Sequence, residues 1–263
     1  MVSDTHSQAG PPSRVGEVAI TWLGHATVLI EIDGLRLLTD PVLRKRVGPL
    51  VRIAPGLDDE AVGVLDCVLL SHLHADHVDL RTLRALRRSG PLVAPRGSRA
   101  WLTARGVSEV VELRAGDEMG LGTVRITATS ARHDGRRWPL GPAADPIGYL
   151  IGGSSGVYFA GDTELFLAMA ELRGLVDVAL LPIWGWGARL GAGHLDPEDA
   201  AAAASLIAPA VAIPIHWGTL ALGRPARRPR DPQRPAREFA AFASRYAPAV
   251  DVRLLAPGER IVL

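Results

Sequence analysis

The sequence is poor in cysteine and in aromatic residues: Cys67 is the single cysteine, and aromatic side chains make up 5% of the chain. One cysteine cannot form a disulfide within the chain, so the fold cannot depend on an internal disulfide framework, and this fits a reducing compartment. Cys67 lies in the apolar run Leu65–Leu70, which indicates a buried thiol rather than a catalytic one.

Long apolar runs are also absent, since none approaches the ~20 residues that a membrane-spanning helix needs. Residues Met1–Gly16 lack the basic start and the apolar core of a signal peptide, and their polar composition predicts a disordered tail. No shift in composition divides the rest of the chain. We therefore expect a cytoplasmic protein in which residues 17–263 form one domain.

The chain shows no excess of either charge, because 29 Lys and Arg stand against 28 Asp and Glu, for a formal net charge of +1. Domains that bind nucleic acid usually carry a clear basic excess. We therefore expect a small-molecule substrate and no nucleic-acid partner, while the oligomeric state stays open.

Strand and helix patterns are present in both halves of the chain. Asp33-Gly34 separates the apolar runs Thr27–Ile32 and Leu35–Thr39, which predicts a β-hairpin. The alanine-rich segment Pro197–Ile207 predicts a helix, with Asp196 as its N-cap and proline in the first turn. Strands followed by mixed strand–helix units, in both halves, predict an α/β fold with two sheets and helices outside.

Three histidines and an aspartate occupy six consecutive positions directly after the buried run Leu65–Leu70: His72, His74, Asp76 and His77. Imidazole and carboxylate groups suit Zn²⁺ and, less specifically, Fe or Mn. One loop can direct the first two histidines to one side and Asp76 with His77 to another, which allows two neighbouring divalent ions. A solvated loop with incidental histidines fits poorly, because the whole chain has only eight.

Further candidate ligands follow other predicted strands. His133 follows Thr123–Thr129, Asp162 follows Val157–Ala160, and His216 follows Val211–Ile215. Each has a simpler alternative when taken alone. Asp162 could only cap a helix over Glu164–Leu172, and either histidine could be a hydrogen-bonded core residue.

These motifs resemble the metallo-β-lactamase superfamily. They are closest to the branch that includes N-acylphosphatidylethanolamine-hydrolysing phospholipase D and ascorbate-6-phosphate lactonase. The resemblance rests on His72-x-His74-x-Asp76-His77 and Gly161-Asp162-Thr163, and also on Trp22–Thr27, Leu38–Pro41, His194–Ala200 and Ile215–Thr219. It implies an αββα four-layer sandwich with the site at one edge between the sheets.

The resemblance also implies a role for each site residue. His72, His74 and His133 would hold one metal ion, and Asp76, His77 and His216 a second, with Asp162 between the two. Asp40 would orient a ligand histidine. His25 would lie near the site without ligating, or serve only a structural hydrogen bond, and His194 would meet substrate at the mouth, or only enter a helix.

The predicted activity is that of a dinuclear metal-dependent hydrolase, in which a hydroxide held by two ions attacks a phosphodiester, a phosphorylated lactone or a related ester. Asp76 and Asp162 would position the nucleophile, and His194 with Arg132 or Arg136 would stabilise the developing charge, since guanidinium groups match phosphate. The arginines could equally be solvated surface.

Alternative functions are a nuclease of the same superfamily, a non-catalytic binding protein that keeps the fold, and, as the weakest option, a β-lactamase. Trp138, Trp184 and Trp186 could form an apolar wall or belong to the core. For the Arg- and Pro-rich stretch Gly223–Arg237 we favour an exposed loop over a lid.

Overall fold

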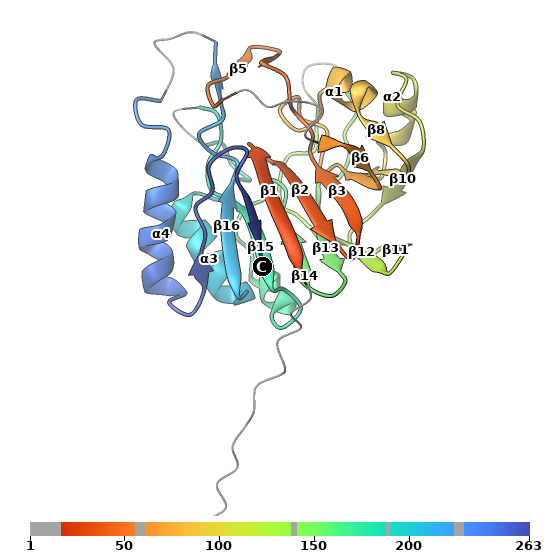
Figure 1. Cartoon of the computed structure of the whole chain (residues 1–263). Coiled ribbons are helices and arrows are strands. Elements are labelled where there is room, and N and C mark those ends of the chain that lie inside the picture. Colours follow the sequence, from red (N-terminus) through yellow and green to blue (C-terminus); the bar gives the residue numbers. More distant parts are fainter. Residues whose placement is uncertain (1–16, 56–61, 138–140, 188–189, 224–228) are drawn as a thin grey trace, which may run out of the picture.

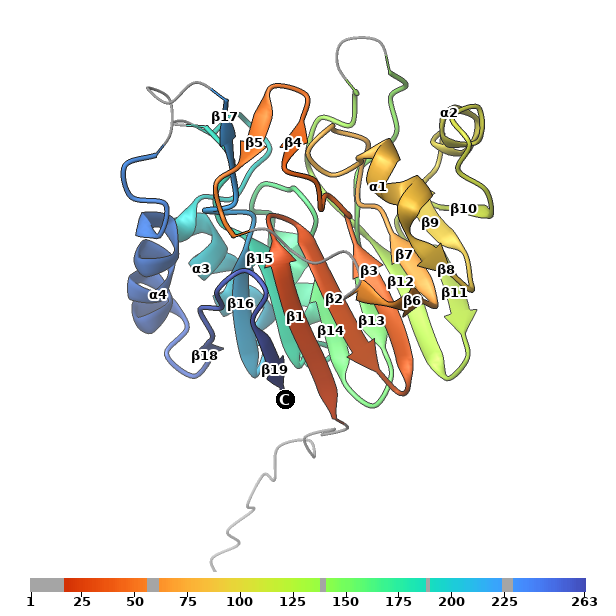
Figure 2. The same ribbon diagram turned by 45° about the horizontal axis from the view of Figure 1, so that its top comes forward.

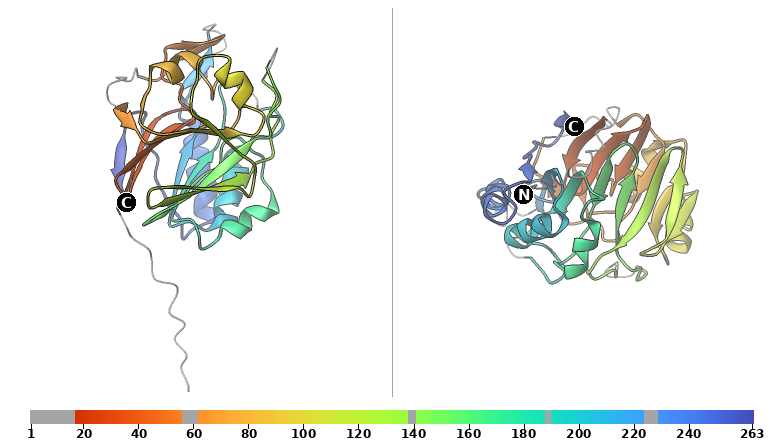
Figure 3. Two further views of the ribbon diagram at one scale, coloured as in Figure 1. Left: turned by 90° about the vertical axis from the view of Figure 1, so that its right-hand side faces the viewer. Right: turned by 90° about the horizontal axis from the view of Figure 1, so that it is seen from below.

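Two β-sheets pack face to face, and helices cover the outer face of each sheet (Figures 1 and 3). The computed structural model describes residues 17–55, 62–137, 141–187, 190–223 and 229–263. The predicted tail, Met1–Gly16, lies outside the described residues. The layers give the two sheets with helices outside that the sequence patterns predict, in the αββα order that the family resemblance implies.

The first sheet has seven strands within the described residues, in the order β10-β9-β7-β3-β2-β1-β19. Their bounds are β1 Val18–Gly24, β2 Thr27–Ile32, β3 Leu35–Thr39, β7 Cys67–Leu69, β9 Leu92–Pro95, β10 Val110–Leu113 and β19 Arg260–Val262. The predicted hairpin joins β2 to β3, and β3 continues into parallel pairing with β7. As a result β1, β3 and β7 all run in one direction.

The second sheet also has seven strands in the described ranges, in the order β11-β12-β13-β14-β15-β16-β18. Their bounds are β11 Glu118–Leu121, β12 Val124–Ser130, β13 Ile147–Gly152, β14 Gly156–Phe159, β15 Val178–Pro182, β16 Val211–Ile215 and β18 Asp251–Val252. Strands β14, β15, β16 and β18 are parallel, and β12 shares their direction because two antiparallel pairings separate it from β14.

Alternation along the strands decides which side chains enter which layer. Leu37 and Leu69 face the second sheet, whereas their neighbours Leu38 and Val68 face outward, where they pack under Leu83 of α1. Helices α1 (Leu80–Ala85) and α2 (Arg99–Thr103) therefore cover the first sheet. The second sheet is covered by η2 (Leu167–Leu172), α3 (Pro197–Ile207) and α4 (Arg234–Tyr246), with α4 packed on α3.

Two small sheets complete the fold within the described residues (Figure 2). Strands β4 (Arg46–Val47), β5 (Leu50–Arg52) and β17 (Leu220–Leu222) form one sheet, and β6 (Val64–Leu65) pairs with β8 (Arg87–Arg88). None of the helices in the described ranges has the length and apolar character needed to cross a bilayer.

The predicted helix over Pro197–Ile207 is confirmed, including its cap: Asp196 accepts hydrogen bonds from the backbone N–H groups of Glu198 and Asp199. The predicted loop over Gly223–Arg237 is wrong at its end, because α4 already begins at Arg234. Proline in the first turn and the Arg234–Glu238 ion pair one turn apart favour this earlier start. Residues 224–228 of that stretch lie outside the described residues.

Candidate metal centre

Seven loops meet at one edge of the sandwich, each directly after a strand that ends there. The first sheet supplies His25 after β1, Asp40 after β3 and the histidine cluster after β7. The second supplies His133 after β12, Asp162 after β14, Trp184 and Trp186 after β15, and His216 after β16. The common strand direction within each sheet therefore places residues from distant parts of the chain together.

The backbone at this edge adopts unusual conformations. His25, Asp40 and His216 have φ angles of 54°, 35° and 66°, in the left-handed region that non-glycine residues rarely occupy. Gly161 has a φ of 62°, and a Cβ there would lie 2.6 Å from the Cβ of Ser71. Glycine at this position lets the loop that carries Asp162 approach the loop that carries His72.

Three histidines, which we call the His72 group, form one half of the cluster: His72, His74 and His133. The Nδ1 of His74 and the Nε2 of His133 face each other at 3.1 Å. Their other ring nitrogens donate to the backbone carbonyls of Arg136 and Gly193, at 3.1 and 2.8 Å. Because a carbonyl can only accept, the two facing nitrogens carry lone pairs.

His72 completes this group, and it too is bonded through its outer nitrogen while its inner nitrogen faces the site. Its Nδ1 lies 2.9 Å from the hydroxyl of Ser71, which itself donates to Asp40 at 2.5 Å. The hydroxyl proton is thus used, so His72 Nδ1 is the donor to Ser71. The opposite nitrogen, His72 Nε2, is buried without a hydrogen-bond partner.

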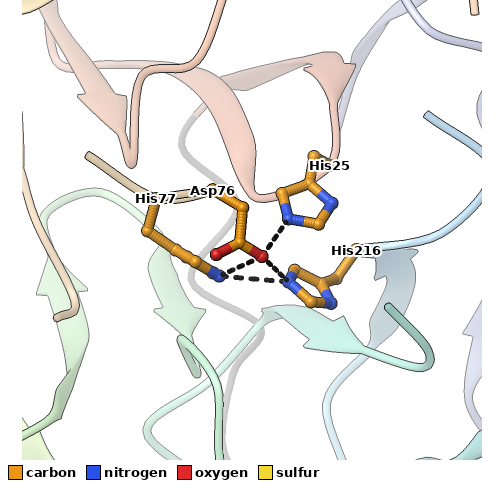
Figure 4. Close-up of side chains that lie close together, drawn as sticks. All are labelled: His25, Asp76, His77 and His216. Carbon is orange, nitrogen blue, oxygen red and sulfur yellow. Dashed lines mark hydrogen bonds and ion pairs between the residues drawn. The ribbon is translucent and has the colours of Figure 1, made fainter. Parts of the chain in front are cut away.

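Four residues, which we call the His77 group, form the other half: His25, Asp76, His77 and His216 (Figure 4). The Nε2 atoms of His77 and His216 face each other at 3.0 Å. Their outer nitrogens bond to the Asp40 carboxylate at 2.7 Å and to the Trp184 carbonyl at 2.6 Å. As in the His72 group, the outer nitrogens of both rings are hydrogen-bonded and the inner nitrogens face each other.

Asp76 lies against this second pair of nitrogens. Its Oδ2 is 3.8 Å from His77 Nε2 and 3.9 Å from His216 Nε2. The same oxygen lies 3.1 Å from His25 Nε2, and it accepts a hydrogen bond of 2.9 Å from the indole N–H of Trp186.

Asp162 lies between the two groups. Its Oδ2 is 3.1 Å from His77 Nε2, 3.9 Å from His72 Nε2 and 4.0 Å from His133 Nε2, and its Oδ1 is 3.3 Å from His216 Nε2. Asp162 does not cap the following helix, because η2 begins after Phe166.

His194 approaches the cluster from the segment before α3. Its Nε2 is 3.5 Å from Asp162 Oδ2, and its side chain keeps 22% of its exposure, the most of the cluster histidines paired with an aspartate. Burial opposes the charged form of His194, yet its hydrogen bond to Asp162 raises the pKa above the usual value. His194 thus combines contact with the cluster and contact with solvent.

Burial sets the charge of most of these imidazoles. It lowers the pKa of His72 well below the usual range, that of His133 to about 4 and that of His216 to about 3, so these rings are neutral near pH 7. His77 differs: burial opposes its charged form, but Asp162, Asp76 and Asp40 raise its pKa well above the usual value.

Asp76 and Asp162 behave in the opposite way, whereas burial raises the pKa of Asp40. Burial alone would raise their pKa, but His77 holds the pKa of Asp76 well below its usual range, and His216 does the same for Asp162. The site therefore gathers buried carboxylates, several neutral imidazoles, and two imidazoles, His77 and His194, whose pKa is raised. Buried carboxylates need positive charge nearby, and facing lone pairs need a cation or a proton between them. The donor set fits divalent metal ions that accept N and O ligands.

The side chains of Arg132 and Arg136, which were expected to contact the substrate, form no hydrogen bond or ion pair with the cluster in the part of the chain that the structure describes. The guanidinium of Arg132 lies 5.2 Å from the ring centroid of Phe166 and 3.9 Å from Glu164. Arg136 is exposed, and the atom that it brings to the site is its backbone carbonyl, bonded to His74. Trp138 lies outside the described residues.

The structure adds two residues that the sequence did not single out for these contacts. Arg137 donates to the carbonyl oxygens of Leu73 and Val78, so it holds both ends of the histidine loop. Trp186 bonds to Asp76 through its N–H, whereas an apolar wall was all that the sequence indicated. Neither contact has a local signal, because the partners are more than 50 residues apart in the chain.

The fold and the site define an αββα protein with a histidine–aspartate cluster at one edge of its sheets. The family model of the β-lactamase superfamily domain matches residues 35–217. A UPF0173 metal-dependent hydrolase of Methanopyrus kandleri is 35% identical over 246 residues, which are 91% of this chain and 97% of that protein.

Two further proteins agree with this match. N-acyl-phosphatidylethanolamine-hydrolyzing phospholipase D 1 of Caenorhabditis elegans is 30% identical over 247 residues, 84% of this chain and 67% of that protein. The structure of a metallo hydrolase of Ignicoccus hospitalis superposes with a TM-score of 0.71 at 27% identity, covering 94% of this chain and 99% of that one. The chain belongs to the metallo-β-lactamase superfamily, as its motifs predict.

Proposed function

We propose that this protein is a hydrolase that depends on two divalent metal ions. His72 Nε2, His74 Nδ1 and His133 Nε2 would hold one ion, and Asp76 with the Nε2 atoms of His77 and His216 would hold the other. Asp162 reaches both groups and would bind between them. Zn²⁺ suits these N and O donors best, and Mn or Fe are the alternatives.

One observation carries this proposal: two separate pairs of imidazole nitrogens face each other, His74 with His133 at 3.1 Å and His77 with His216 at 3.0 Å. Their outer nitrogens are fixed as donors by backbone carbonyls and by Asp40. Each pair is repulsive without a cation or proton between its members, so the chain has two places that favour a cation. The bonded outer nitrogens also orient the rings, as in known metal sites.

Divalent ions would supply Lewis acidity, which polarises a carbonyl or phosphoryl oxygen and lowers the pKa of water. Asp76 and Asp162 would orient the attacking water and accept its proton. His25 and Trp186 both contact Asp76 Oδ2, and they would fix the direction of that carboxylate. His194 has a raised pKa and a partly exposed side chain, and it would donate a hydrogen bond to the atom of the substrate on which negative charge develops.

For the substrate we propose a small ester, phosphodiester or phosphorylated lactone. The name of the Caenorhabditis elegans relative describes phosphodiester hydrolysis, which supports this class by similarity. The placement of Arg132 beside Glu164 gives no support to phosphate binding by that residue. The single cysteine supports a cytoplasmic location, and we propose that residues 17–263 act as one domain.

The test is the metal content of the purified protein by mass spectrometry, measured together with turnover of bis-p-nitrophenyl phosphate and of a lactone panel. We expect about two equivalents of metal per chain and turnover that a chelator abolishes. His72→Ala and His216→Ala should each remove one equivalent. A folded protein that takes up no metal after loading would overturn the proposal and favour a non-catalytic binding protein.

A further inference from the structure

A cavity of about 420 Å³ lies next to the His77 group and has no part in the proposed chemistry. One wall is the segment after β15, with Trp184, Gly185, Trp186 and Gly187. The other walls come from β17 and from the start of α4. These segments are far apart in the sequence and form the cavity only in the folded chain.

Both tryptophans of this cavity form hydrogen bonds with residues of the candidate metal centre. The Trp186 indole N–H donates to Asp76 Oδ2 at 2.9 Å, and the Trp184 carbonyl accepts from His216 Nδ1 at 2.6 Å. Between them, a Cβ on Gly185 would lie 3.9 Å from His216 Cε1. The segment that forms this wall of the cavity therefore also holds two candidate metal ligands, Asp76 and His216, by hydrogen bonds.

The remaining lining is mostly apolar, and three of its four charged residues are held in ion pairs. Apolar groups come from Leu220, Pro229, Pro232 and Pro235. Arg234 pairs with Glu238 at 2.7 Å, and Asp231 pairs with Arg237. Arg230, also in the lining, is exposed. Indole and proline rings present flat apolar surfaces, which select flat apolar ligands over strongly hydrated ones.

We propose that this cavity binds a flat apolar, preferably aromatic, group of the substrate, and so places the bond to be cleaved at the metal centre. This inference rests on the proposed function, because it assigns the cavity to the substrate of that site. Trp186 would serve twice, since its ring contacts the bound group and its N–H positions Asp76. The substrate would then be an ester or phosphoester that carries an aromatic or similarly flat apolar substituent.

The first experiment measures binding without catalysis. N-phenyl-1-naphthylamine is neutral, aromatic and fluorescent in apolar sites, and it would be titrated into metal-free and metal-loaded protein. We expect one saturable site per chain in both forms. Trp186→Ala should weaken binding about tenfold, because one aromatic face is lost, whereas Trp186→Phe should keep it within about twofold.

The matched control is Leu254→Ala, at an exposed residue that lines a neighbouring cavity of about 500 Å³ beside Trp217. This variant should bind the probe like the native protein. If Leu254→Ala weakens binding and Trp186→Ala does not, the probe occupies the neighbouring cavity and the proposal is wrong. Thermal unfolding of each variant checks that the fold is retained, and Trp186 is 37% exposed, so its replacement should be tolerated.

The second experiment compares methyl phenylacetate with methyl acetate, which differ only by the aromatic ring. The kcat/KM of methyl phenylacetate divided by that of methyl acetate should fall about tenfold in Trp186→Ala, mainly because the KM of methyl phenylacetate rises. In Trp186→Phe this ratio should stay near the native value. Trp186→Phe should instead lower kcat for both esters, because Asp76 loses its indole donor. An unchanged ratio in Trp186→Ala would overturn the assignment of the cavity.

The two proposals fail in different ways. If the protein hydrolyses neither ester and holds no metal, the proposed function is wrong, and probe binding alone then decides whether the cavity accepts aromatic groups. If hydrolysis depends on metal but the probe does not bind, or binds equally well to Trp186→Ala, the cavity proposal is wrong and the hydrolase proposal stands.

Discussion

Single residues of the site hold strained backbone conformations that their hydrogen bonds enforce. The His25 carbonyl accepts from the Trp22 indole at 2.9 Å and from the His216 backbone N–H at 2.8 Å, and the His25 N–H donates to Thr219 at 2.8 Å. Left-handed conformations cost on the order of 1 kcal/mol or more for residues with a Cβ. The fold therefore maintains an unfavourable backbone in order to direct these side chains inward.

Asp40 is the residue for which this arrangement is easiest to test. Its carboxylate accepts from His77 Nδ1 and from Ser71, whose hydroxyl in turn binds His72, so one buried aspartate supports both halves of the cluster. Asp40→Asn keeps the shape and tolerates the positive φ, but it replaces one acceptor with a donor. We expect metal affinity to fall roughly 10–100-fold, measured by competition with a chelator.

The control for this prediction is Asp33→Asn. Asp33 also has a positive φ, 50°, but it lies in the turn between β2 and β3, away from the cluster. Metal affinity should not change there. Equal losses in the two variants would mean that Asp40 acts on general stability and not on the ligand histidines.

At the scale of elements, the loop between β7 and α1 is fixed from outside. Arg137 donates to the carbonyl oxygens of Leu73 and Val78, and its guanidinium lies 4.7 Å from the ring centroid of Trp101. The loop between those carbonyls carries His74, Asp76 and His77. A clamp on both of its ends limits how far the ligands can separate.

Removal of the Arg137 side chain should lower metal retention more than it lowers the stability of the fold. Arg137→Ala should weaken metal retention about tenfold during dialysis against a chelator, with a smaller change in the melting temperature. Arg136→Ala is the neighbouring comparison and should retain metal, because the contact of Arg136 with His74 uses its backbone carbonyl. Retention that is equal in both variants would contradict the assigned role of Arg137.

The close approach of two loops at Gly161 gives a second test at this scale. In Gly161→Ala the added Cβ would lie 2.6 Å from Ser71 Cβ and 3.1 Å from the Ile147 carbonyl. Gly174 also has a positive φ, 78°, but has no atom within 4 Å of the Cβ position. We expect Gly174→Ala to cost on the order of 1 kcal/mol of unfolding free energy from backbone strain alone.

Gly161→Ala should cost at least about 1 kcal/mol more than Gly174→Ala, because overlap adds to strain, and it should also lose metal. Chemical denaturation of both variants, with metal analysis, measures the two effects. Similar free energies in the two variants would show that the loops can separate without penalty.

For the whole molecule, the sandwich buries a cluster of titratable groups at one edge, among them His25, Asp40, His72, His77, Asp162 and His216. In the metal-free protein, burial lowers the pKa of five histidines, which are His25, His72, His74, His133 and His216. Burial also opposes the charged forms of His77 and His194, but Asp162 raises the pKa of both. All seven take up protons near pH 6.5 in the unfolded chain.

The unfolded chain therefore binds more protons than the folded one as the pH falls below about 6.5, so acid destabilises the fold. The folded pKa of His133, about 4, places most of this loss between pH 6.5 and 4. The depressed carboxylates add to it only below their ordinary pKa, about 3.9. We expect the melting temperature of metal-free protein to fall from pH 7 to pH 5.

Calorimetry of chelator-treated protein at those two pH values tests this expectation. The metal-loaded protein should lose more stability over the same interval, because protons also compete with metal for the imidazoles. A melting temperature that is constant or rises on acidification would mean that the two raised histidines outweigh the five lowered ones.

The sequence by itself determined most of the long strands, an α/β fold with two sheets and helices outside, and most of the cluster, while the αββα layering came from the family resemblance. The long strands are marked by apolar residues that either alternate or run without a break, and each candidate ligand follows its strand within a few residues, as Asp162 and His216 do. The Asp196 cap and the helix after it could also be read directly, because a cap depends only on neighbouring residues.

Only the tertiary structure decided the contacts between segments that are far apart in the chain. It brought Arg137 to the histidine loop and Trp186 to Asp76, and it turned Arg132 toward Glu164. These contacts depend on how the two sheets and their loops pack, which no local pattern encodes. The facing imidazole nitrogens and the cavity beside them arise for the same reason, because they exist only when both halves of the chain are folded together.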